Sequence, residues 1–109
     1  MSLTSYYIQA CTKAWLTCEN LLIGLFENET SFSQRTMQVI DECSHICFGT
    51  IQALEQQQVN LHQIALLCVG ICEECAEVCD RYTNNVFSDC AATCRECSAI
   101  VAQLISAPV

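Results

Sequence analysis

Cysteine dominates the chemistry available to this chain. Eleven of the 109 residues are cysteines: Cys11, Cys18, Cys43, Cys47, Cys68, Cys72, Cys75, Cys79, Cys90, Cys94 and Cys97. Thiolates are soft ligands that select Cu(I), Zn(II) or iron–sulfur clusters over hard cations. Cysteine also serves as a small core hydrophobe, but Ala or Val would fill that role without the risk of oxidation. We therefore interpret all eleven cysteines as candidate metal ligands.

Spacing and charge favour Cu(I) among the soft metals. The repeated Cys-x3-Cys spacing along a helix differs from the short knuckle motifs that hold structural zinc. A Zn(II) ion with four thiolates also keeps a net negative charge, at a cost on the order of several kcal/mol per ion in a dry core. Cu(I) accepts fewer ligands, and with about one bridging thiolate per metal the core stays near neutral. We expect several Cu(I) ions per chain, with Zn(II) as the alternative.

These cysteines need helices to position them. Apolar residues recur with a period near 3.6, which predicts helices at about 3–26, 33–57, 61–83 and 86–105. Offsets such as those of Cys68, Cys72, Cys75 and Cys79 fall within roughly 60° of one helical face, together with the apolar residues. The short connections force sequential helices to lie antiparallel. The sequence thus predicts an all-α protein, residues 1–109 forming a single antiparallel up-down-up-down four-helix bundle with a cysteine-lined core.

Helical rise places all the sulfurs in one slab of this bundle, between two apolar ends. Ser31 or Ser33 is expected to cap the second helix, Asn60 the third and Asn85 the fourth. The residues expected to close the two ends are Tyr7, Ile8, Leu54, Leu61 and Leu104 at one, and Leu25, Phe26, Phe32, Tyr82 and Phe87 at the other.

The other candidate soft ligands fall off the cysteine stripes. His45 lies opposite the stripe of its helix and is expected at the surface, whereas His62 lies about 120° from its stripe. Met37 flanks the stripe of the second helix and is expected to pack in the core.

Composition limits the partners. A net charge of −8 with only 4 Lys and Arg argues against nucleic acid or an anionic membrane surface as a partner. No apolar stretch of about 18 residues is present, so no membrane span is predicted. The first ten residues carry no export signal, which favours a cytoplasmic location. The odd cysteine number and the helical spacing argue against a secreted disulfide scaffold.

The cysteine motifs resemble those of the four-helix-bundle copper storage proteins over essentially the whole chain. The motifs are Cys68-x3-Cys72-x2-Cys75-x3-Cys79, Cys90-x3-Cys94-x2-Cys97 and Cys43-x3-Cys47. The resemblance implies that core thiolates bind and store Cu(I). Fuller members carry closely spaced cysteine pairs on every helix, whereas here Ala14 and Trp15 lie between Cys11 and Cys18. These gaps leave room for a smaller or different metal load.

The leading hypothesis is a non-enzymatic protein that stores or sequesters Cu(I). One alternative is a thiol-redox or oxidant-sensing protein, which needs an exposed, low-pKa thiol near a positive charge. Lys13, Arg81 and Arg95 are expected to point away from the core face. Another alternative is a structural bundle that binds Zn(II). Self-association as a homo-oligomer is a further expectation, carried by apolar residues off the stripes such as Leu21, Leu67 and Val69.

Overall fold

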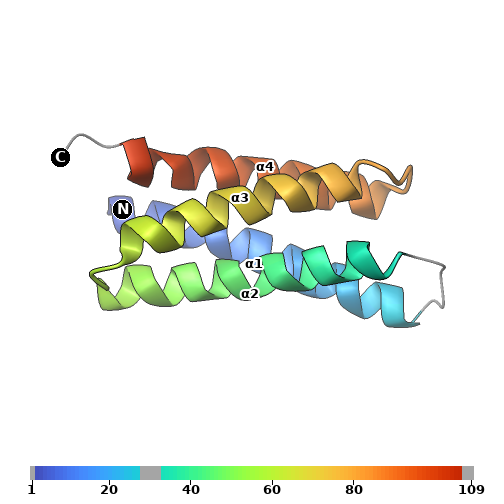
Figure 1. Ribbon diagram of the computed structural model, residues 1–109, viewed down its shortest axis with the longest axis horizontal. Coiled ribbons are helices and arrows are strands. Elements are labelled where there is room, and N and C mark those ends of the chain that lie inside the picture. The colour runs from blue at the N-terminus through green and yellow to red at the C-terminus, as the bar shows by residue number, and fades with distance from the viewer. Residues whose placement is uncertain (1, 28–32, 107–109) are drawn as a thin grey trace.

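The computed structural model describes residues 2–27 and 33–106, and its regular elements are helices. They are α1 (Leu3–Glu27), α2 (Gln34–Gln56), α3 (Leu61–Cys79) and α4 (Asn85–Ser106). The helices run alongside one another, with the α2–α3 turn at the end of the bundle where α1 begins and α4 ends (Figure 1). No helix in the described ranges is long and apolar enough to cross a membrane.

Each helix packs against two neighbours. α1 contacts α2 and α4, α3 contacts the same two helices, and α1 and α3 face each other across the core. Buried aliphatic and cysteine side chains from all four helices fill the space between them. The predicted all-α, antiparallel four-helix bundle with a cysteine-lined core is confirmed.

The helix starts differ in how they are capped. Ser33 caps α2 as predicted, because its hydroxyl accepts a hydrogen bond from the Thr36 amide at 3.1 Å. Asn60 is the N-cap residue of α3, as predicted, but its side chain makes no capping hydrogen bond. Ser31 lies outside the described residues.

The cap of α4 is Asn84 rather than Asn85. The Asn84 Oδ1 accepts a hydrogen bond from the Val86 amide at 2.8 Å, whereas Asn85 is the first residue of the helix. Both asparagines suit this position, so the sequence alone does not separate them.

α3 ends at Cys79 and not at Thr83 as predicted. The Arg81 amide donates to the Val78 carbonyl and the Tyr82 amide to the Cys79 carbonyl, at 3.3 and 3.1 Å. These three-residue bonds tighten the chain into turns and end the α-helical ladder. Tyr82 keeps a helix-like spacing in the sequence but lies in this turn.

Apolar groups close both ends of the bundle. At the end where α1 begins, Tyr7 and Leu54 are buried, with Ile8 and Leu104 packed against the core. At the other end Leu25 and Phe87 are buried, and the Tyr82 ring stacks on Phe87 at a centroid distance of 4.3 Å. Leu61 is half-buried. The side chain of Phe26 and the whole of Phe32 lie outside the described part of the chain.

Of the apolar residues expected off the stripes, Leu21 is instead a core residue, 3% exposed. The buried face of α1 is wider than the cysteine stripe, as is usual for a bundle helix. Leu67 is exposed, and Val69 packs partly against the core.

Candidate metal centre

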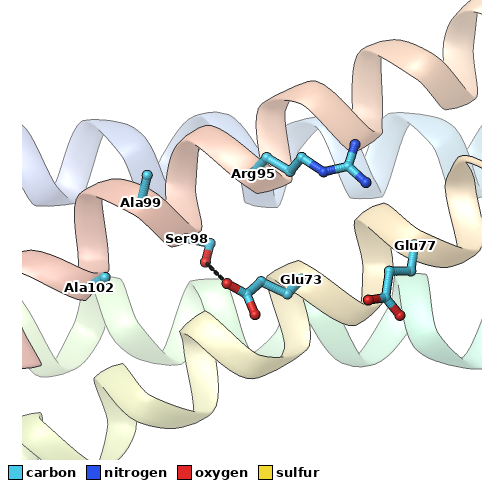
Figure 2. Close-up of a pocket in the computed structure, with 6 residues that line it drawn as sticks. All are labelled: Glu73, Glu77, Arg95, Ser98, Ala99 and Ala102. Atoms are coloured by element: carbon cyan, nitrogen blue, oxygen red, sulfur yellow. Dashed lines mark hydrogen bonds between the residues drawn. The ribbon is translucent and has the colours of Figure 1, made fainter.

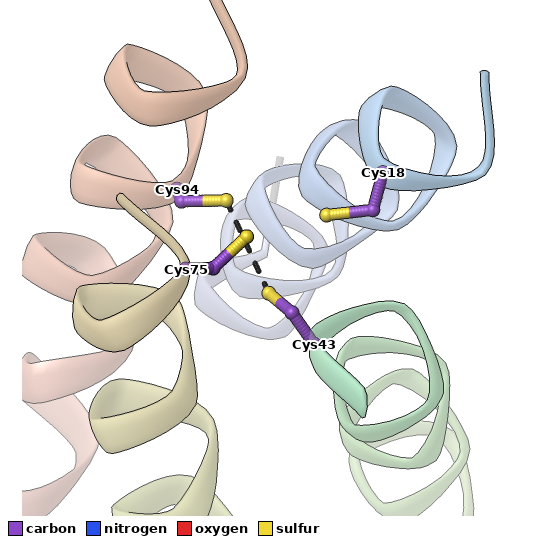
Figure 3. Close-up of side chains that lie close together, drawn as sticks. All are labelled: Cys18, Cys43, Cys75 and Cys94. Carbon is purple, nitrogen blue, oxygen red and sulfur yellow. Dashed lines mark hydrogen bonds between the residues drawn. The ribbon is translucent and has the colours of Figure 1, made fainter. Parts of the chain in front are cut away.

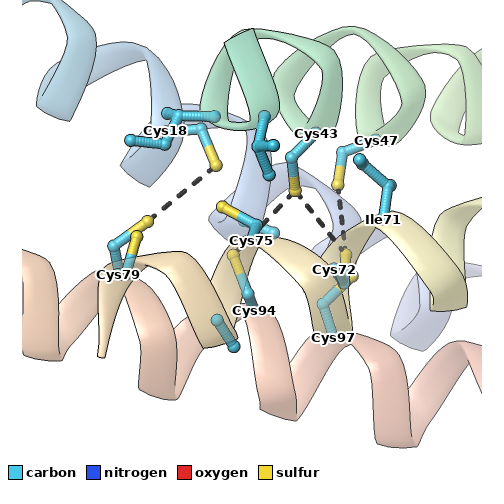
Figure 4. Packing of buried hydrophobic residues seen from close by; sticks show 14 of the residues in the cluster. Cys18, Cys43, Cys47, Ile71, Cys72, Cys75, Cys79, Cys94 and Cys97 are labelled. Carbon is cyan, nitrogen blue, oxygen red and sulfur yellow. Dashed lines mark hydrogen bonds between the residues drawn. The ribbon is translucent and has the colours of Figure 1, made fainter. Parts of the chain in front are cut away.

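All eleven cysteines lie inside the bundle. None has more than 1% of its surface exposed, and all are free thiols. α1 and α2 contribute two each, α3 four and α4 three. Figure 4 shows the sulfurs of several of them pointing into the interior from different helices. The predicted convergence of these residues in one shared slab of the core is therefore what the helices produce.

The sulfur atoms are already close enough to share ions. The Sγ–Sγ distance is 3.7 Å between Cys47 and Cys72, and 3.9 Å between Cys43 and Cys72. It is 4.0 Å between Cys43 and Cys94 and between Cys18 and Cys90. Two sulfurs about 2.3 Å from one metal lie about 3.8 Å apart at a tetrahedral angle and about 4.6 Å apart when they flank it in line. The observed distances suit shared coordination.

Ten of the eleven thiols fall into three groups whose sulfurs lie within 4.8 Å of one another. The first group takes one thiol from each helix, namely Cys18, Cys43, Cys75 and Cys94 (Figure 3). The second group is Cys47, Cys68, Cys72 and Cys97, and the third is Cys75, Cys79 and Cys90. Cys75 belongs to two groups, so the first and third are joined through its sulfur. Cys11 is in none of them.

The packing of the thiols controls their ionisation. Hydrogen bonding to Cys43 and Cys75, with burial added, raises the pKa of Cys18 far above its ordinary value. Hydrogen bonding to Cys68 and Cys97, followed by burial, raises the pKa of Cys11 in the same way. Hydrogen bonds from Cys18 and Cys43 instead lower the pKa of Cys94. Cys94 therefore loses its proton most easily in the first group, while its partners hold theirs.

The remaining candidate ligands stay outside the core. His45 is exposed, with its Nδ1 2.8 Å from the Asp41 carbonyl oxygen, and His62 is exposed near the start of α3. Met37 is half-buried and packs against the core. These positions match the expectations from helical spacing. In the described part of the chain the three groups contain sulfur ligands alone.

The positive side chains also point away from the thiols. Arg95 pairs with Asp80, and Lys13 Nζ lies 3.8 Å from Glu96 Oε2, all at the surface. Arg81 is exposed. The ion pairs of Lys13 and Arg95 are with carboxylates, and the charge of Arg95 also interacts at a distance with Cys94.

Ser44 and Ser98 are two further buried residues beside the thiols that the sequence analysis did not predict. Each directly follows a core cysteine, and their exposures are 1% and 4%. A signal was available, because residues 42–46 and 96–100 read Glu-Cys-Ser-His-Ile and Glu-Cys-Ser-Ala-Ile.

The fold and site define a class of protein: an antiparallel helical bundle whose interior is lined with thiols at metal-sharing distances. The family model described as copper storage protein matches residues 2–106. The chain belongs to the copper storage protein family, and the resemblance drawn from its cysteine motifs is confirmed.

The chain is also similar to two known proteins. The chain is 25% identical over 92 residues to the uncharacterized cysteine-rich protein YhjQ of Bacillus subtilis (strain 168), a match covering 84% of this chain and 85% of that protein. The fold of this chain matches that of the Cu(I)-bound copper storage protein BsCsp3 with a TM-score of 0.86 and 21% identity. That match covers 96% of this chain and 100% of the other, and at this identity it shows a shared fold.

Proposed function

We propose that this protein binds and stores several Cu(I) ions as cargo through the thiolates of its eleven core cysteines. The observation that carries the proposal is the grouping of ten buried thiols into three clusters, two of which share Cys75. A shared sulfur suits a chain of ions joined by bridging thiolates. Membership of the copper storage protein family supports the same function.

The surroundings of the thiols favour Cu(I) over Zn(II). The buried polar residues of the described chain are Thr36, Ser44, Thr50 and Ser98, none of them a cation. Two zinc ions in the two four-thiol groups would each leave excess negative charge in this core, with no buried cation to offset it. One Cu(I) per thiolate leaves the core near neutral.

Storage also fits the thiols better than thiol-redox catalysis. A catalytic or sensing thiol has to meet its substrate and ionise near neutral pH. Here every cysteine is buried, and Lys13 and Arg95 pair with surface carboxylates. We therefore place the protein among metal stores rather than enzymes.

The deciding experiment is an anaerobic titration of the fully reduced protein with Cu(I) against a chromophoric Cu(I) chelator, with Zn(II) titrated in parallel. We expect several tightly held Cu(I) ions per chain, approaching the thiol count. Replacing Cys68, Cys72, Cys75 and Cys79 with Ala should lower that capacity while far-UV circular dichroism shows the bundle retained. Binding of at most one or two Cu(I), or a clear preference for Zn(II), contradicts the proposal.

Two finer points belong to the same proposal. Eleven free thiols persist best in a reducing compartment, which supports a cytoplasmic site of action. Exposed apolar side chains at Leu66 and Leu67 on α3 support self-association. Cell fractionation tests the first point, and sedimentation of wild type against Leu67→Gln tests the second.

A further inference from the structure

Two hydrogen bonds tie neighbouring helices together beside the thiols. Ser44 on α2 donates to the Glu19 carboxylate on α1, and Ser98 on α4 donates to Glu73 Oε1 on α3 at 3.1 Å (Figure 2). In both pairs the serine follows its glutamate by 25 residues. We call these two contacts the serine clips.

The two buried threonines of the described chain have different partners. Thr50 donates to the Ile46 carbonyl of its own helix at 2.7 Å. Thr36 lies at one end of the bundle, where its hydroxyl contacts Ser33 and Tyr82. Among these buried hydroxyls, the two serines are therefore those that bridge to a carboxylate on a neighbouring helix.

Each clip adjoins two thiols of one group. Glu19 follows Cys18 and Ser44 follows Cys43, and both cysteines belong to the first group. Glu73 follows Cys72 and Ser98 follows Cys97, and both belong to the second group. Successive residues of a helix have a fixed rise and rotation, so a hydrogen bond that holds one residue in place also fixes the height and rotation of the cysteine beside it. Each clip therefore fixes one pair of sulfurs relative to each other.

The same arrangement occurs in both halves of the chain. The α1–α2 hairpin and the α3–α4 hairpin each carry Cys-Glu on their first helix and Glu-Cys-Ser-x-Ile on their second. Most other positions of the two hairpins differ, including Cys11 and Cys47, which have no cysteine counterpart at the equivalent point. The sequence segments that the two hairpins share therefore contain the clip residues and the two cysteines beside them.

We propose that Glu19, Ser44, Glu73 and Ser98 are positioning residues that hold Cys18 opposite Cys43 and Cys72 opposite Cys97 before metal arrives. The two clipped pairs are then the sites that take up the first Cu(I) ions. Apolar packing between helices is non-directional, whereas a hydrogen bond fixes register. A pair ordered in advance does not lose conformational freedom on binding, so it binds more tightly. This inference rests on the proposed Cu(I) storage function.

The test compares the first steps of loading in clip variants. Ser44→Ala and Ser98→Ala, singly and together, remove the donors with little change in size and suit a helix. Ser106→Ala is the matched control, because the Ser106 hydroxyl bonds only the Ala102 carbonyl of its own helix among the contacts described. Glu19→Gln and Glu73→Gln keep an acceptor oxygen and serve as the conservative variants.

We expect each serine variant to weaken binding of the first Cu(I) at its own pair roughly five- to tenfold, which is the cost of ordering on binding a pair of side chains that the clip had ordered in advance. The Cu(I) load at saturation should stay at the wild-type value. The Gln variants and Ser106→Ala should keep most of the wild-type affinity. Competition with a chromophoric chelator at one and two Cu(I) per chain measures this.

A spectroscopic readout separates positioning from general stability. With ¹³C-labelled cysteine, the first Cu(I) should shift the Cβ signals of Cys18, Cys43, Cys72 and Cys97 in wild type. In Ser44→Ala it should shift those of Cys72 and Cys97 first. An unchanged order of filling in Ser44→Ala, or an equal affinity loss in Ser106→Ala, would overturn the proposal that the serine clips position the first Cu(I) sites. Absence of Cu(I) binding in wild type would instead overturn the storage function itself.

Discussion

Cys75 and Cys11 are both fully buried thiols, but their neighbours differ. Cys75 belongs to two thiol groups, whereas Cys11 belongs to none and contacts Cys68 and Cys97 at the edge of the second group. A sulfur that bridges ions contributes to more than one site. The two residues therefore test whether the grouping of sulfurs decides the metal load.

Cys75→Ala should lower the Cu(I) load at saturation by about one to two ions, and Cys11→Ala by one or none. Both changes remove a single buried sulfur of the same size, so each is the matched control of the other. Anaerobic titration with metal analysis after gel filtration gives the load. Equal losses in the two variants would mean that the groups seen in the metal-free bundle are not those that bind.

The buried thiols also make the metal-free protein sensitive to alkali. Neighbouring thiols and burial raise the pKa of Cys11 and Cys18, while unfolded cysteine ionises near pH 8.5. Above that pH the unfolded chain loses protons that these folded thiols keep, so stability should fall as pH rises. The slope should be about 1.4 kcal/mol per pH unit for each thiol that stays protonated.

Urea unfolding of the reduced, metal-free protein between pH 7 and about pH 9.5 measures this slope. The Cu(I)-loaded protein is the control, because its ligand thiols have already released their protons. A metal-free stability that stays constant across this range would show that the thiols ionise inside the folded bundle.

At the scale of the helices, periodicity predicted the elements well because each helix buries one face. The expected bounds agree with α1, α2 and α4 to within one residue at each end. The end of α3 was missed because Tyr82 keeps the apolar spacing while local turn bonds set by residues 78–82 stop the helix. The cap of α4 was misplaced between two adjacent asparagines with the same capping chemistry.

The turn after α3 gives a prediction of its own. Phe87 is 3% exposed and stacks on Tyr82 over the end of the bundle near Cys79 and Cys90. Phe87→Ala should destabilise the metal-free protein by about 3 kcal/mol, since it removes a buried ring. It should also speed Cu(I) transfer to an external chelator, because this end of the core becomes less tightly closed.

Chemical denaturation and stopped-flow transfer kinetics measure the two effects. Val86→Ala, at an exposed neighbour on the same helix turn, is the control and should change neither. Loss of stability without faster transfer would show that copper does not pass this end of the bundle.

For the whole molecule, the sequence predicted that all eleven sulfurs share one core but not which of them form groups. Membership in a group depends on shifts of an ångström or two between helices, which the 3.6-residue period leaves undetermined. The serine clips supply part of that information, and they contain ordinary polar residues that carry no metal chemistry themselves. Their repetition in both hairpins was the one signal available in the sequence.

Cu(I) loading should raise the thermal stability of the whole bundle. Ions that bind the folded thiol groups and not the unfolded chain add roughly 2.7 kcal/mol per site at a free concentration of 100 times Kd. Circular dichroism melts of metal-free and loaded protein should show the same helix content below the transition and a higher Tm after loading. A Tm that does not rise would place the metal outside the core.

The complete burial of the thiols has a consequence for time as well as for affinity. A ligand that removes an ion has to touch it, and no sulfur is reachable from solvent in the closed bundle. Departure of the cargo therefore waits for a transient opening between helices, whose frequency follows local stability. The same packing that stabilises the bundle therefore sets the rate at which the metal leaves. A cell that needs this metal quickly has to supply a partner or a change of conditions that loosens the helices.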